Sequence, residues 1–132
     1  MKIIPTTIHG LLDYIVGLML ILSPLFLADS DNSSSNAVLI FSGVLTIIYS
    51  SLTDYEYGIV PMIPMKIHLA LDITAAVFLL TSPWICGFYY QVYLPHVLFA
   101  TMELAVISMS QIIPKSKKST LNQSYANRKS TH

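Results

Sequence analysis

Charged side chains are scarce in this chain: Asp, Glu, Lys and Arg make up 11% of its 132 residues. Soluble domains usually carry about 25%. The sequence therefore lacks the groups that cover a water-facing surface, which excludes an ordinary soluble domain. Basic and acidic residues balance at seven each; this balance says nothing about nucleic acid, and we expect no nucleic-acid partner. The length leaves room for one compact domain.

Cysteine is nearly absent as well, since Cys86 is the only one. A single thiol excludes an internal disulfide and a cysteine-based metal cage. The sequence also contains no nucleophile motif, no glycine-rich phosphate loop and no zinc motif. We therefore expect a non-enzymatic protein. The absence of these motifs also predicts that the protein holds no metal and no cofactor.

Long apolar runs are what the chain has instead, within a composition that is 54% hydrophobic. A helix needs about 20 apolar residues to cross a bilayer. Four runs approach this length, at about residues 8–28, 37–53, 65–86 and 94–113. They predict an all-α fold, a four-helix transmembrane bundle over residues 1–113 in contact with lipid. The polar, basic remainder, residues 114–132, is expected to be a disordered tail.

The basic residues predict the orientation of this bundle. Lysine and arginine collect in cytoplasmic loops, and all seven fall on one side of a four-span topology: Lys2, Lys66, Lys115, Lys117, Lys118, Arg128 and Lys129. Both termini should therefore be cytoplasmic. The competing interpretation of the first run is a secretory signal peptide. Asp13 inside the run and the lack of an A-x-A-like site after it argue against this alternative.

The first and third runs resemble each other at an offset of 59 residues. The segments Ile4–Asp13 and Ile63–Asp72 share the pattern I-P-x-x-I-H-x-x-L-D, and nine of the 21 positions from Ile4 to Pro24 match their partners. Both copies run in the same direction through the bilayer. The pattern predicts two parallel-duplicated helical hairpins, at about residues 4–53 and 63–113, related by a pseudo-two-fold axis along the membrane normal.

The same residues carry a family resemblance. The segment S-P-W-x-x-G-F at Ser82–Phe88, preceded by H-x-x-x-D at His68–Asp72, is similar to the SPW-repeat family of small bacterial membrane proteins. The first copy departs from the pattern at Leu25 and Asp29, where tryptophan and phenylalanine are typical. The resemblance implies four helices in a bacterial cytoplasmic (inner) membrane and brings no established activity with it.

Ionisable residues inside the runs need a reason, because burying them in a bilayer is costly. His9 and Asp13 are four residues apart and share a helix face, as do His68 and Asp72. Further polar residues lie at similar depth in the second and fourth runs. The candidates for a buried polar network or ligand site are His9, Asp13, His68, Asp72, Glu103, Ser50 and Thr53.

Two interpretations of this network remain open. In the structural one, the His–Asp pairs are a satisfied polar network that fixes helix register. In the functional one, they bind a proton or a small ligand, or, since H-x-x-x-D has metal-ligand spacing, a metal or haem. The leading hypothesis is a structural or small-ligand-binding membrane protein. The alternatives are a proton-coupled or small-solute transporter, which would need a homo-oligomer, and a haem-binding redox subunit.

Each Ser-Pro step predicts a helix bend or end near the outer surface. Proline removes a helical N–H donor, and the preceding serine can bond the carbonyl that proline frees. This helix-bend motif comprises Ser23, Pro24, Ser82, Pro83 and Trp84. Trp84 is interpreted as an anchor at the membrane interface.

Overall fold

The computed structural model describes residues 3–26, 33–114, 117 and 122–123. Within them the chain forms four α-helices, α1 (Thr6–Phe26), α2 (Ser33–Ser51), α3 (Met65–Ile85) and α4 (Leu94–Met109). The described residues contain two isolated β-bridges and no longer strand, which confirms the all-α prediction. Most of the predicted tail, and Asp29 and Asp31 of the first loop, lie outside the described residues.

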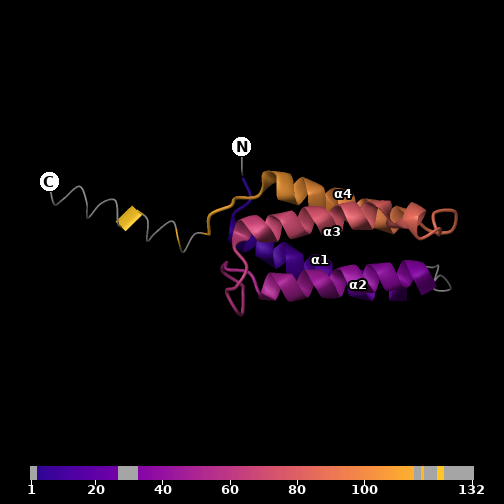
Figure 1. The fold of residues 1–132 in the computed structure, drawn as a ribbon, viewed down its shortest axis with the longest axis horizontal. Helices are drawn as coiled ribbons and strands as arrows, with labels where there is room; N and C mark the ends of the chain where they lie inside the picture. The colour runs from indigo at the N-terminus through magenta and orange to yellow at the C-terminus, as the bar shows by residue number, and fades with distance from the viewer. Residues whose placement is uncertain (1–2, 27–32, 115–116, 118–121, 124–132) are drawn as a thin grey trace.

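The helices form two antiparallel hairpins, α1–α2 and α3–α4, that lie side by side along a common axis (Figure 1). Helices α1, α2 and α3 are long and apolar enough to cross a membrane, and α4 is a shorter apolar helix. Large apolar side chains such as Leu25, Phe26 and Ile85 point outward. An apolar exterior around buried polar residues is the arrangement that a bilayer stabilises.

Each hairpin is tied to the other where its second helix ends. The Ile4 N–H donates to the Met109 carbonyl at 2.9 Å, and the Gln111 N–H donates to the Ile4 carbonyl at 2.8 Å. Ile63 makes the same two bonds, each 2.8 Å long, with Leu52 and Asp54. Ile4 thus flanks Ser110, and Ile63 flanks Thr53, in two parallel bridges.

The proline after each bridging isoleucine starts the next helix. Pro64 is the N-cap of α3, and its carbonyl accepts the His68 N–H at 3.1 Å. Pro5 accepts the His9 N–H at 3.0 Å in the same way. Proline suits a helix start because its missing N–H would have no partner there. The I-P-x-x-I-H pattern therefore places each histidine one turn inside its helix, next to the bridge.

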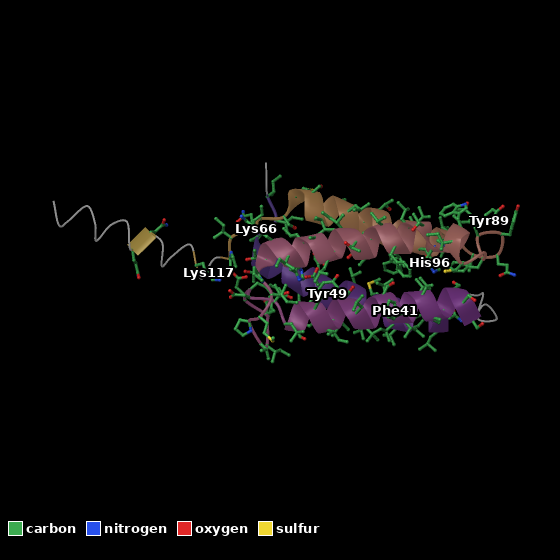
Figure 2. All side chains as sticks on the ribbon, viewed as in Figure 1. Phe41, Tyr49, Lys66, Tyr89, His96 and Lys117 are labelled. Carbon is green, nitrogen blue, oxygen red and sulfur yellow. The ribbon has the colours of Figure 1, made fainter. Side chains whose placement is uncertain are left out.

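The half of the bundle away from the two bridges is packed with apolar side chains. Leu20, Leu39, Leu79 and Ala100, one from each helix, form a buried cluster with Val38 and Phe88. This layer separates the two ends of the bundle. The polar residues of interest consequently lie at the end that carries the two bridges, where Lys66 and Lys117 also lie (Figure 2).

Candidate functional site: a buried histidine–aspartate cluster

Four predicted residues meet at the bridged end of the bundle. One ligand atom from each of His9, Asp13, His68 and Asp72 lies within 4.8 Å of all the others. The two imidazole rings are at most 1% exposed, and the two aspartates at most 9%. Because α1 supplies one His–Asp pair and α3 the other, the cluster lies between the two hairpins.

The histidines and aspartates pair across the hairpins. His9 Nε2 lies 3.1 Å from Asp72 Oδ2 and 3.5 Å from Asp13 Oδ1 on its own helix. His68 Nε2 lies 3.0 Å from Asp13 Oδ2 and 3.2 Å from its own Asp72 Oδ2. The two Nε2 atoms are 3.3 Å apart. Each histidine is therefore nearer to the carboxylate of the other hairpin.

A hydroxyl group from the other hairpin contacts Nδ1 of each histidine ring. Thr53 Oγ1, just after α2, lies 2.9 Å from His68 Nδ1. Ser110 Oγ, just after α4, lies 2.8 Å from His9 Nδ1. Thr53 and Ser110 are the residues at the two β-bridges. The backbone pairing that joins the hairpins thus also positions these hydroxyl groups.

Two tyrosine rings cover the His68 side of the cluster. The Tyr49 ring stands edge-on to the imidazole with centroids 5.3 Å apart, and the Tyr55 ring lies at 5.5 Å. Tyr55 belongs to the loop between α2 and α3, and it packs against Gly10 of α1. Burial, with a contribution from the Asp13 carboxylate, raises the pKa of Tyr55 above its ordinary value. This phenol therefore stays protonated and adds no charge to the site.

A small cavity adjoins the opposite side of the cluster. Its volume is about 40 Å³, and its polar lining comes from His9, Asp13, Thr46 and Glu103. A cavity of this size has room for a water molecule. Glu103, which the sequence predicts as part of the network, faces this cavity. Within the described part of the chain, no hydrogen bond or ion pair links Glu103 to the four cluster residues.

The remaining predicted site residues lie around or away from the cluster. Ser50 is fully buried on α2, one turn before Thr53, and the described residues give it no bond to the histidines or aspartates. At the far end, Ser23 Oγ donates to the Leu20 carbonyl at 2.7 Å, and Ser82 Oγ donates to the Leu79 carbonyl at 2.8 Å. These are the carbonyls that Pro24 and Pro83 leave without a helical donor.

Helix α3 ends at Ile85, two residues after Pro83, and the described part of α1 runs to Phe26, two residues after Pro24. Trp84, beside Pro83, is 53% exposed and stacks on Tyr89 at a centroid distance of 6.2 Å. Tyr89 lies at the opposite end of the bundle from Lys66 (Figure 2). His96, also toward that end, is buried against Phe88 and does not join the cluster.

Sequence reasoning missed Ser110, Tyr49 and Tyr55 as parts of the site. A signal for Ser110 existed, because a hydroxyl residue follows the second helix of each hairpin. Thr53 and Ser110 are 57 residues apart, however, while the repeat offset is 59, so alignment of the two copies does not bring them together. Nothing in the local pattern indicates that a loop tyrosine folds back over His68.

Comparison with known proteins identifies the family of this chain. The family model of the SPW repeat domain matches residues 7–111, a stretch that includes every residue of the cluster and all four helices except Thr6, the first residue of α1. Neither the curated proteins nor the solved structures contain a significant match. Because the family model covers well over half of its length, the chain belongs to the SPW repeat domain family.

Proposed function

We propose that this protein is a non-enzymatic, multi-pass protein of the bacterial cytoplasmic membrane, with both termini in the cytoplasm. In this proposal its two repeated hairpins are joined by the His–Asp cluster, which is also its site for a small ligand. The family and the apolar helices support the membrane assignment. The basic residues near the bridged end, such as Lys66 and Lys117, support the orientation.

The observation that carries the proposal is the exchange of partners between the hairpins. Asp72 and Ser110 of the second hairpin contact the two nitrogens of His9, and Asp13 and Thr53 of the first hairpin contact those of His68. Removing the partner of a buried carboxylate leaves its charge uncompensated, which typically costs about 3–5 kcal/mol. The cluster is therefore expected to provide much of the free energy that holds the hairpins together.

A double-mutant cycle tests this role. His9→Ala, Asp72→Asn and the double variant are purified in detergent, and their free energies of unfolding are measured by reversible denaturation. Each single change should cost about 3 kcal/mol or more. The coupling energy of His9 with Asp72 should be about 1–3 kcal/mol and should exceed that of His9 with Asp13, since the cross-hairpin distance is the shorter one.

The matched control is a cycle between His96 and Asp72. His96 is a fully buried histidine outside the cluster, so its coupling with Asp72 should be near zero. A His9–Asp72 coupling no larger than this control would show that the cluster does not join the hairpins.

The cavity beside the cluster favours a second candidate function, the transport of a small solute or ion by an oligomer. The carboxyl groups of Asp13 and Glu103 both line it, and intramembrane carboxyl groups commonly mark ion pathways. This candidate predicts that Glu103→Gln abolishes uptake of the transported solute or ion into proteoliposomes. The same change should leave the free energy of unfolding within about 0.5 kcal/mol of wild type. Uptake that is unaffected by the substitution would rule out this pathway.

The geometry does not support haem between the two histidines. An iron held by two imidazoles separates their nitrogens by about 4 Å, twice an ordinary metal–nitrogen bond, and the macrocycle fills the plane between them. The Nε2 atoms of His9 and His68 are 3.3 Å apart. This spacing leaves no room for a porphyrin.

A further inference from the structure

We propose that one divalent transition-metal ion of the zinc type is bound in tetrahedral geometry by His9, Asp13, His68 and Asp72. This inference rests on the proposed function, because it names the ligand of the site that joins the hairpins. Three features of the described residues carry it: the orientation of the two imidazole rings, the spacing of the four ligand atoms, and the charge that they bury.

The hydroxyl groups determine which ring nitrogen carries a hydrogen. Thr53 Oγ1 donates to the Tyr49 carbonyl, and Ser110 Oγ donates to the Val106 carbonyl, both at 2.7 Å. A hydroxyl group has one hydrogen, so each oxygen accepts a hydrogen bond from the Nδ1–H of its histidine. A neutral ring then presents the lone pair of Nε2 to the centre of the cluster.

This is the arrangement of metal-ligating histidines, whose second nitrogen donates to a neighbouring group that orients the ring. The two Nε2 lone pairs, at 3.3 Å from each other, repel unless a positive charge lies between them. In the ion-free protein a hydrogen on each Nε2 would bridge to a carboxylate oxygen at 3.0–3.1 Å, and a metal ion would displace these hydrogens on binding. A metal ion at the centre would meet the lone pairs of both histidines and the oxygens of both aspartates.

The spacing of the four ligand atoms fits a tetrahedral ion. Bonds of about 2.0–2.2 Å from zinc to nitrogen or oxygen place tetrahedral ligand atoms about 3.3–3.6 Å from one another. The two Nε2 atoms and the Oδ2 atoms of Asp13 and Asp72 give four distances of 3.0–3.3 Å. His9 Nε2 lies 3.5 Å from the other Asp13 oxygen, Oδ1, and one ligand atom from each of the four residues can be chosen within 4.8 Å of the others. Small movements of the side chains would complete the coordination.

The buried charge also matches a divalent ion. Metal coordination requires deprotonated ligands, and two ionised aspartates with two neutral histidines would present a charge of −2 in a region where uncompensated charge is costly. Asp72 Oδ1 is buried and has no hydrogen-bond donor among the described residues, so this carboxylate depends on compensation from the cluster centre. The mixture of imidazole and carboxylate ligands favours zinc-type ions over calcium or magnesium, which prefer all-oxygen sites.

Metal titration of the full-length protein tests this inference. The protein is purified in detergent, stripped with a chelator and titrated with Co²⁺, followed by Zn²⁺ in competition. We expect one Co²⁺ per chain, with the intense visible absorption of tetrahedral Co²⁺, and full displacement by Zn²⁺. His68→Ala should weaken binding about 100-fold or more, and His96→Ala should leave it within about threefold.

The titration of the wild-type protein decides the matter even if a variant fails to fold. No Co²⁺ or Zn²⁺ bound per chain, an octahedral Co²⁺ spectrum, or equal loss in His68→Ala and His96→Ala would overturn the metal site. If the His9–Asp72 coupling persists in such a metal-free protein, the cluster still joins the hairpins and only the inferred ligand is wrong. If the coupling is absent as well, the proposed function fails with it.

Discussion

Gly10 is next to His9 in α1 and faces the ring of Tyr55. A Cβ atom at this position would overlap the ring carbons Cδ2 and Cε2. Tyr55 in turn covers His68, so a larger residue at Gly10 would displace the ring that covers His68. The absence of a side chain at one position thus allows a loop residue to seal the site.

Gly10→Ala is expected to destabilise the protein by about 1–3 kcal/mol, the usual cost of overpacking. Thermal unfolding in detergent measures the effect. In a Tyr55→Ala background the clash is absent, and the same change should stabilise α1 by up to about 1 kcal/mol through its helix propensity. Destabilisation of equal size in both backgrounds would contradict the role given to Tyr55.

The four cluster residues were recognisable from the sequence because ionisable groups are rare in apolar helices and these recur at one offset. Their partners were not recognisable. The i, i+4 spacing predicted pairs within a helix, whereas His9 lies nearer to Asp72 than to Asp13. Which carboxylate a histidine meets depends on how closely two helices approach, and side-chain spacing along one helix does not contain that distance.

At the scale of the elements, α1 and α2 approach each other closely where two glycines meet. A Cβ atom on Gly43 would lie 2.5 Å from the Gly17 carbonyl oxygen, and one on Gly17 would lie 3.1 Å from the Gly43 carbonyl oxygen. Small residues let membrane helices pack backbone to backbone. This contact sets the spacing of the first hairpin and hence the position of Asp13.

Gly43→Leu should therefore separate α1 from α2 and lower the free energy of unfolding by about 2 kcal/mol or more. Denaturation in detergent provides the measurement. The neighbouring change Val44→Leu is the control, because Val44 faces outward and should tolerate it within about 0.5 kcal/mol. Equal effects of the two substitutions would show that the glycine contact does not determine the spacing.

The number and order of the helices follow from the apolar runs, but their ends do not. The fourth run continues to Ile113, whereas α4 ends at Met109, because the chain straightens there to pair with Ile4. Likewise α2 is already helical at Ser33, several residues before its apolar run. Hydropathy reports the lipid-facing length, while backbone pairing and polar helix ends decide where a helix begins and stops.

At the scale of the whole molecule, Cys86 reports the orientation of the bundle. It is the only cysteine in the sequence and is exposed at the C-cap of α3, whose other end adjoins the Ile63 bridge. If the bridged end is cytoplasmic, a membrane-impermeant maleimide should label Cys86 in intact spheroplasts. A Cys86→Ser variant with Lys66→Cys should be labelled only after lysis. The reverse pattern would invert the proposed topology.

The two bridges give the bundle a closed, cyclic plan, in which the end of each hairpin pairs with the beginning of the other. Neither half contains a complete set of partners for its own histidine. A shorter protein consisting of one such hairpin would recover the same four side chains by assembling with an identical copy about a true two-fold axis. The chain therefore encodes in one polypeptide what a self-associating half would obtain by dimerisation, and its site no longer depends on protein concentration.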